Sequence, residues 1–180
     1  MLLRKKGMID LKKFIRQIPD WPKPGINFKD ISPLLQNSDA FALAVQKLCL
    51  PFAGSQIDKI AGIDARGFIF ASVCAHRLKK GFIMARKKDK LPPKVVSTKY
   101  ALEYSENELE IQIDSVKQGE NVLIIDDVLA TGGTTKATAE LIETLGGNIV
   151  GYSFLIELTG LKGRKMLSKY KINSIIKYKW

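Results

Sequence analysis

The strongest chemical signal in this sequence is a pair of acids followed by a run of small residues. Asp126 and Asp127 come after the apolar run 122–125, and the next loop contains Gly132 and Gly133. Glycines let a phosphate approach backbone N–H groups, whereas ionised carboxylates repel phosphate and accept hydrogen bonds from vicinal hydroxyls. The segment therefore predicts a site for a ribose 5-phosphate group.

A buried strand and an amphipathic helix must position this loop. Residues 122–125 are continuously apolar, as in a parallel strand that is covered on both faces. From Thr134 the apolar residues recur at helical spacing, and Gly146-Gly147 supplies the stop. The loop thus joins the carboxyl end of a strand to the amino end of a helix, where the helix dipole favours an anion.

A second junction of this kind lies earlier in the chain. Asp64-Ala-Arg-Gly67 follows a predicted strand at 57–63 and precedes a predicted helix at 68–78. Its backbone amides and the Arg66 guanidinium suit a diphosphate. Two such loops at one edge of a parallel sheet form a crevice, which predicts an α/β, doubly wound, mainly parallel sheet with flanking helices.

Other segments complete the predicted elements. The spacing of Met8, Leu11, Ile15 and Ile18 predicts a first helix that ends before Pro19. Further elements are a helix at 38–50 and strands at 82–85, 148–158 and 172–176.

The segment 87–113 differs in character from its surroundings. It begins with a polar, proline-broken stretch and continues with alternating residues around a predicted turn at 105–108. We expect a long projecting β-hairpin, and its low apolar content makes it a candidate mobile lid.

Length and composition predict one domain over residues 1–180. Cys49 and Cys74 have apolar neighbours and no metal-ligand spacing, so we expect buried thiols and no protein-held metal. The start of the chain does not resemble a secretory signal, and no apolar run is long enough to span a bilayer. We therefore expect a cytoplasmic protein without a membrane partner.

The charge pattern argues against nucleic acid as a partner. The net charge of +11 would permit such binding, but the lysines are spread along the chain and no nucleic-acid-binding motif occurs. His76 is the only histidine, and its place on the predicted helix at 68–78 indicates a structural or surface role, which argues against Ser-His and Cys-His nucleophiles. The sequence also lacks the glycine motifs of P-loop ATPases and dinucleotide-binding proteins.

The segment 122–135 resembles the 5-phosphoribosyl 1-pyrophosphate (PRPP) motif of type I phosphoribosyltransferases. Several other segments are similar to adenine phosphoribosyltransferases, in the same order, so that the resemblance runs from about Met8 to the end. They are Pro24–Leu35, Ala61–Phe68, Arg86–Pro92, Tyr100–Tyr104 and Glu157–Arg164. The resemblance implies the type I phosphoribosyltransferase fold, with a small N-terminal hood mainly within 8–35 and the hairpin at about 87–113 as its lid.

The resemblance also implies an activity. Adenine would displace pyrophosphate from PRPP and give AMP, through a transition state that resembles a ribose oxocarbenium ion. Mg²⁺ would be the cofactor, bound mainly through PRPP and water rather than through protein ligands. The protein would act in purine salvage and form a homodimer.

Site residues follow from the same resemblance. The implied catalytic residues are Glu103, as the acid that protonates adenine, and Arg66. The implied PRPP and AMP site consists of Asp64, Ala65, Arg66, Lys87, Lys90, Asp126, Asp127, Ala130, Thr131, Gly132, Gly133 and Thr134. The implied adenine site consists of Asn27, Phe28, Lys29 and Leu158. A cis peptide is implied at Asp64-Ala65.

The chain departs from the family pattern at Lys29, where arginine is usual, and at Asp89, where glycine is usual. Two alternatives to adenine transfer stay open. One is a PRPP-sensing regulatory protein without catalysis, and the other is a phosphoribosyltransferase for another base.

Overall fold

A computed structural model describes residues 9–102 and 105–179. The chain divides into two compact units, Met1–Gln46 and Lys47–Trp180, and each is described by itself. The single domain predicted over 1–180 stays a prediction. Within the described ranges, no helix combines the length and apolar character that a membrane span requires.

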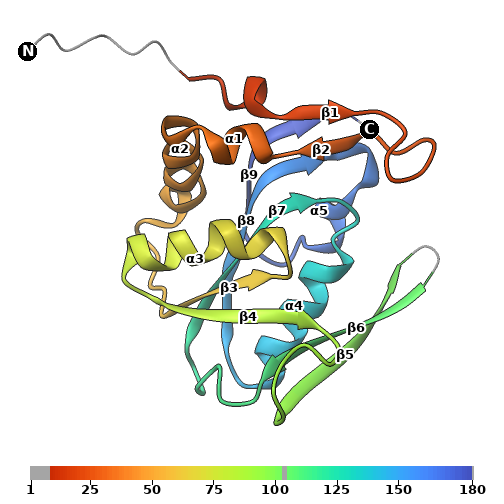
Figure 1. Cartoon of the computed structure of the whole chain (residues 1–180). Helices are drawn as coiled ribbons and strands as arrows, with labels where there is room; N and C mark the ends of the chain where they lie inside the picture. The colour runs from red at the N-terminus through yellow and green to blue at the C-terminus, as the bar shows by residue number, and fades with distance from the viewer. Residues whose placement is uncertain (1–8, 103–104, 180) are drawn as a thin grey trace, which may run out of the picture. The chain divides into compact units, whose positions relative to one another are not determined.

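The N-terminal unit contains a small antiparallel sheet (Figure 1). Its elements are η1 (Leu11–Phe14), β1 (Arg16–Ile18), β2 (Phe28–Asp30) and α1 (Ser32–Gln36), and α2 (Ser38–Cys49) crosses into the second unit. The predicted first helix over 8–18 is therefore wrong in its described part. The chain makes one 3₁₀ turn and then extends, and Gln17 pairs with Lys29 across the two strands.

A seven-stranded sheet forms the centre of the second unit. Its strands are β3 (Lys59–Ile63), β4 (Gly81–Lys87), β5 (Val95–Leu102), β6 (Ser105–Gln112), β7 (Asn121–Leu129), β8 (Asn148–Leu158) and β9 (Ile172–Tyr178). They lie in the order β5-β6-β4-β3-β7-β8-β9. The run β4-β3-β7-β8-β9 is parallel, and β5 and β6 are antiparallel to their neighbours, so the sheet is mainly parallel as predicted.

The two long helices of this unit cover opposite faces of the sheet. The helices are η2 (Leu50–Phe52), α3 (Arg66–Leu78), α4 (Gly133–Thr144), η3 (Thr159–Leu161) and α5 (Gly163–Met166). Ala61 and Ile63 of β3 belong to one buried cluster with Ala137 of α4. Gly62, between them in β3, faces the opposite side of the sheet. A methyl group added there would lie 2.7 Å from Cβ of Ala71 in α3. The doubly wound arrangement places both helix amino ends after carboxyl ends of neighbouring strands.

The strands β5 and β6 form a two-stranded arm beside the parallel strands (Figure 1). In the described residues, β6 pairs with β4 at Arg86 and Lys87. The predicted turn at 105–108 is wrong, because these residues pair with 99–102 in the ladder. Their polar composition resembles a turn, but they form the first half of β6, opposite the second half of β5. The predicted lid role of the arm stays a prediction.

Candidate functional site

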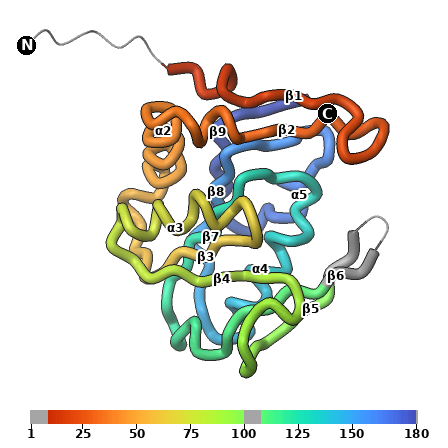
Figure 2. The backbone as a smooth tube through the Cα atoms, in the orientation of Figure 1, coloured from red at the N-terminus to blue at the C-terminus, as the bar shows by residue number. Residues whose placement is uncertain are grey.

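The β7–α4 junction carries the acids and the glycine loop. Asp126 and Asp127 lie inside β7, which continues to Leu129, so the prediction that the strand ends before them is wrong. The loop is correspondingly short, because α4 begins directly after Gly132. Figure 2 shows the chain passing from β7 into α4. Gly132 has a φ of 87°, a conformation that glycine adopts at little cost. The first turn of the twelve-residue α4 therefore presents backbone amides at the carboxyl end of β7.

The loop has a close backbone neighbour at the start of α5. A methyl group on Gly163 would lie 2.2 Å from the carbonyl oxygen of Ala130 and 2.9 Å from the carbonyl carbon of Thr131. A methyl group on Gly132 would lie 3.0 Å from the carbonyl oxygen of Gly163. Side chains at these glycines would separate the two segments, so α5 supports the loop by direct backbone packing.

The β3–α3 junction is shorter than predicted. Helix α3 begins at Arg66, two residues earlier than expected, so that only Asp64 and Ala65 separate it from β3. The Asp64-Ala65 peptide is cis, as the resemblance implied. Ala65, the N-cap residue of α3, has no side chain that could cap the helix, so the first amide groups of α3 face the junction. This end of α3 offers the backbone donors that were predicted to bind a diphosphate.

The two junctions meet at the acids. Nη2 of Arg66 lies 2.6 Å from Oδ2 of Asp127, and the Asp127 side chain is 8% exposed. A methyl group on Gly67 would lie 2.4 Å from Oδ1 of Asp126, so α3 approaches β7 at a distance that requires glycine. The structure thus brings the groups predicted for ribose, 5-phosphate and diphosphate to one edge of the sheet.

The acids sit in an environment that disfavours two negative charges. Burial raises the pKa of Asp126, and the charge of Asp127 raises it further. Burial also raises the pKa of Asp127, although the Arg66 guanidinium opposes this rise. The Asp127 backbone N–H donates to Oδ1 of Asp126 at 2.8 Å, which fixes that carboxylate. The pair needs hydrogen-bond donors or a positive charge to hold both acids ionised.

A basic loop follows β4 and is tied to the β3–α3 junction. Nε of Arg86 donates to Oδ2 of Asp64 at 3.0 Å, and Nη1 of Arg86 donates to the Lys90 carbonyl at 2.8 Å. Lys87 and Lys90 are exposed. Asp89 has a φ of 60°, and its N–H donates to a carboxylate oxygen of Glu110 at 3.2 Å. Aspartate is one of the few residues other than glycine that adopt this left-handed backbone without a large cost.

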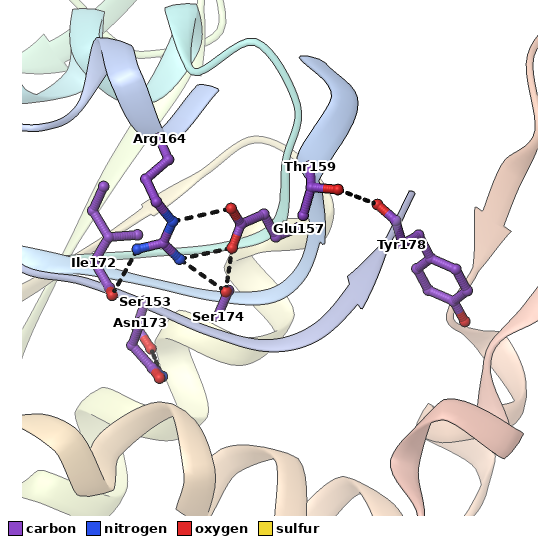
Figure 3. Close-up of polar contacts among 8 residues, drawn as sticks. All are labelled: Ser153, Glu157, Thr159, Arg164, Ile172, Asn173, Ser174 and Tyr178. Atoms are coloured by element: carbon purple, nitrogen blue, oxygen red, sulfur yellow. Dashed lines mark hydrogen bonds and ion pairs between the residues drawn. The ribbon is translucent and has the colours of Figure 1, made fainter. Parts of the chain in front are cut away.

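The end of β8, the start of α5 and β9 share a network that the sequence did not predict (Figure 3). Glu157 is 5% exposed, and its carboxylate accepts two hydrogen bonds from Arg164, at 3.0 and 2.7 Å. Ser174 of β9 donates to the same carboxylate and accepts from Arg164 at 3.1 Å. The Arg164 and Ser174 bonds lower the pKa of Glu157, although burial opposes them. Leu158, the predicted adenine contact, directly follows Glu157 and is buried.

The remaining predicted adenine residues lie in the N-terminal unit. The Phe28 ring packs edge-on against Trp21, with 4.5 Å between ring centroids. Lys29 is 6% exposed, and its ammonium group donates to Oε1 of Gln17 at 2.7 Å. Burial and the charge of Lys12 lower the pKa of Lys29.

Asn27 completes this group. Its Nδ2 also donates to Oε1 of Gln17, at 3.3 Å. Its Oδ1 is buried, and no described residue donates a hydrogen bond to it. A ligand with an N–H group would satisfy this acceptor. The contacts of Gln17 with Asn27 and Lys29 were not predicted from the sequence, because the segment that contains Gln17 was predicted to be a helix.

Two predictions concern features that these contacts do not test. Glu103 lies outside the described residues. In residues 9–102 and 105–179, no three or more His, Cys, Asp or Glu side chains are grouped to hold a metal ion. A magnesium ion that shares substrate oxygens and water needs only one or two carboxylates, and Asp126 and Asp127 are chemically suited to that.

Comparisons with known proteins give matches over nearly the whole chain. A model of the phosphoribosyl transferase domain matches residues 27–180. An adenine phosphoribosyltransferase of Thermosipho melanesiensis is 52% identical over 170 residues, which cover 94% of this chain and 97% of the relative.

Solved structures agree with these matches. The adenine phosphoribosyltransferase of Thermoanaerobacter pseudethanolicus has a TM-score of 0.91 and 48% identity, and the alignment covers 93% of this chain and 98% of the other. The enzyme of Giardia lamblia, complexed with 9-deazaadenine, has a TM-score of 0.89 and 36% identity over 95% and 97% of the two chains. The fold class predicted from the sequence is therefore confirmed.

Proposed function

Since this chain belongs to the adenine phosphoribosyltransferase family, we propose that its two strand-to-helix junctions carry the transfer of ribose 5-phosphate from PRPP to adenine. The chain is a transferase of purine salvage that converts adenine and PRPP to AMP and pyrophosphate. The observation that supports this use of the junctions is the approach of Arg66 to Asp127, at 2.6 Å. It joins a diphosphate-binding group and a hydroxyl-binding group at one edge of the sheet.

The proposed binding mode follows the chemistry of each junction. The 5-phosphate accepts hydrogen bonds from backbone amides and hydroxyls between Ala130 and Thr134, at the amino end of α4. The ribose hydroxyls donate to Asp126 and Asp127. The diphosphate binds the amides of the β3–α3 junction and the Arg66 guanidinium, with Lys87 at the end of β4 and Lys90 in the basic loop as further cations.

The chemical step requires stabilisation of charge rather than a protein nucleophile. The bond from the anomeric carbon to the diphosphate oxygen breaks, and adenine N9 forms the new bond with inversion. Arg66 and the α3 amides stabilise the negative charge that develops on the departing diphosphate. The carboxylates of Asp126 and Asp127 hold the ribose in position while its ring carries positive charge. Glu103 is proposed to exchange a proton with adenine: its carboxylate accepts the proton that the base loses when N9 forms the bond, and in the reverse reaction it is the acid that protonates adenine. Closure of the arm excludes water.

Magnesium completes the proposed site as a counter-charge. When bound, it would neutralise the diphosphate and make it a better leaving group. Substrate oxygens and water would provide most of its ligands, and the carboxylates of Asp64, Asp126 and Asp127 are oxygen donors present at the two junctions.

Adenine is proposed to contact the N-terminal hood and Leu158. Phe28 would stack on the base, and backbone groups around Lys29 would read its edge. The buried Oδ1 of Asn27 offers an acceptor to the 6-amino group of adenine. A 6-oxo purine has no donor at that position, so the same acceptor would disfavour hypoxanthine and guanine.

A homodimer is proposed from an apolar face on α3 and β4. Ile69 and Val73 lie one helical turn apart and are 36% and 37% exposed, and Phe82 and Met84 are 36% and 40% exposed. Exposed apolar side chains gathered in this way favour an interface between copies. Sedimentation should give the mass of a dimer, and Val73→Glu should shift it toward the monomer. A monomeric wild-type protein would contradict this part of the proposal.

The cytoplasmic location and the lack of a nucleic-acid partner stay predictions.

Incubation with PRPP, Mg²⁺ and one base at a time tests the proposed function. AMP and pyrophosphate should form in equal amounts, and adenine should be preferred over hypoxanthine by roughly 10⁴-fold, because a polar mismatch would be buried. The comparisons do not favour the two alternatives. Equal turnover of hypoxanthine would nevertheless support another base, and PRPP binding without AMP formation would support a regulator.

The hydroxyl-binding role of the acids has its own test. The double variant Asp126→Asn, Asp127→Asn should fold and bind PRPP at least 10-fold more weakly, since each lost charge-assisted bond costs about 1.5–3 kcal/mol. Titration calorimetry with PRPP and Mg²⁺ measures the change. Asp114→Asn, at an exposed acid outside the site, is the control. Unchanged affinity in the double variant would exclude these acids as ribose ligands.

A further inference from the structure

We propose that Arg164 is a positioning residue for the 5-phosphate loop and acts through Gly163; this inference rests on the function proposed above. Arg164 has no predicted contact with a substrate. Its guanidinium is instead held by the carboxylate of Glu157, by the Ser174 hydroxyl and by the Ile172 carbonyl at 3.3 Å (Figure 3). These contacts join the start of α5 to β8 and β9.

The burial of the Glu157 carboxylate makes its contact with Arg164 strict in both charge and geometry. The Glu157 side chain is 7% exposed, whereas the Arg164 side chain is 42% exposed. A carboxylate with so little access to water needs its positive partner, and the two parallel hydrogen bonds also fix the partner's orientation. The position of Arg164 is therefore set by Glu157 more strictly than a surface ion pair would set it.

The position of Arg164 is transmitted to the phosphate loop by the preceding residue. Gly163 packs against the backbone of Ala130 and Thr131, and its carbonyl oxygen faces Gly132. Each glycine lacks the side chain that would separate the two segments. A shift of Arg164 moves Gly163, and the loop then loses the surface that holds its amides in place.

This connection predicts a selective defect. Arg164→Ala leaves Glu157 buried without its partner, and the segment between them is free to move away from β8. Ribose 5-phosphate binds through the phosphate loop, so its affinity should fall at least 10-fold. Pyrophosphate binds at the β3–α3 junction and should keep its affinity within about twofold. A role in stability alone would lower the unfolding temperature without separating the two ligands.

Titration calorimetry with ribose 5-phosphate and with pyrophosphate, each with Mg²⁺, tests the proposal on full-length protein. Guanidinium ion at millimolar concentration should not restore ribose 5-phosphate binding to Arg164→Ala, because the free ion can pair with Glu157 but has no covalent link to Gly163. Restored binding would contradict transmission through Gly163. Lys169→Ala is the matched control. It removes an ion pair of the same C-terminal segment, 2.8 Å from Lys169 to Glu143, and should bind both ligands as wild type does.

Further variants decide the question if Arg164→Ala does not fold. Arg164→Lys keeps the charge but not the paired geometry and should show the same selective loss to a smaller degree. Gly163→Ala should weaken ribose 5-phosphate binding at least 10-fold with Arg164 intact, while Gly54→Ala, which has no atom within 4 Å of the added methyl group, should not.

The outcomes separate the inference from the proposed function. Wild-type protein that binds neither ligand contradicts the proposed function. Wild-type protein that binds both, with variants that bind both equally well or lose both equally, contradicts the positioning role of Arg164.

Discussion

Replacing Gly67 with alanine should damage catalysis more than stability. Alanine is normally the better residue in a helix, by up to about 1 kcal/mol, and Gly67 lies in the first turn of α3. The added methyl group would lie 2.4 Å from Oδ1, 3.2 Å from Cγ and 3.4 Å from Cα of Asp126. Either the carboxylate turns away or α3 and β7 move apart.

Both responses weaken the PRPP site by a similar amount. Ordinary van der Waals contact begins at 3.4 Å, so the closest pair must separate by about 1 Å. A misplacement of that size costs on the order of 10²-fold in rate. Rotation of Asp126 instead removes a charge-assisted bond to a ribose hydroxyl, worth about 1.5–3 kcal/mol, or roughly 10- to 100-fold. We therefore expect kcat/KM for PRPP to fall by about 10²-fold.

Steady-state kinetics and urea unfolding on the same preparation separate the two effects. The free energy of unfolding should change by no more than about 1–2 kcal/mol, because helix propensity partly offsets the crowding. Gly81→Ala is the control, since its methyl group would meet Lys59 at an ordinary 3.4 Å. A Gly67→Ala enzyme with kcat/KM within twofold of wild type would refute the argument from close approach.

Two further predictions concern the acids and the arm. Burial and the charge of Asp127 raise the pKa of Asp126, so PRPP affinity should be lost as the pH falls through that raised pKa, and Asp126→Asn should flatten the dependence measured by calorimetry. The stability of the ligand-free protein should depend on pH in the opposite direction. Because folding raises the pKa of Asp126, this group stabilises the folded state at low pH, and its contribution to the free energy of unfolding is lost as the pH rises through the folded-state pKa. Glu103→Gln should lower kcat by about 10²-fold and spare AMP binding, and amide exchange between Lys90 and Glu108 should slow when PRPP and Mg²⁺ are added. A fully active Glu103→Gln variant, or equal exchange with and without ligand, would contradict the lid and acid roles.

The sequence predicted the strand-to-helix junctions because their signals are local. A continuous apolar run marks β7, helical spacing marks α4, and Gly146 ends that helix with a φ of 86°. The Asp64 junction was recognisable for the same reason, and its helix starts within two residues of the prediction. Signals of this kind need no knowledge of the partner strands.

The errors arise where a partner strand decides the local structure. Leu11 and Ile15 fit a helical face, yet the chain extends after Phe14 because Arg16–Ile18 pairs with Phe28–Asp30. The acids were expected after their strand, but β7 continues through them because it pairs with β8 as far as Leu129 opposite Glu157.

The site contacts that depend on distant residues were also missed. Arg164 meets Ser174 of β9, and Gly163 meets Ala130, and no spacing rule connects these positions. The predicted strand at 148–158 has eleven residues, which could have indicated that its neighbour β7 is also long and continues through the acids.

The parallel pairing of β3 with β7 has a consequence for how the protein folds. Asp58 and Asn121, at the start of this pairing, are hydrogen-bonded at 2.8 Å although they lie 63 positions apart in the chain. Closing so long a loop costs roughly 4 kcal/mol in chain entropy before any contact across it forms. The antiparallel arm needs no such closure, because its strands are neighbours in sequence. During refolding, far-ultraviolet ellipticity should therefore recover before the protein gains the ability to bind a phosphorylated ligand.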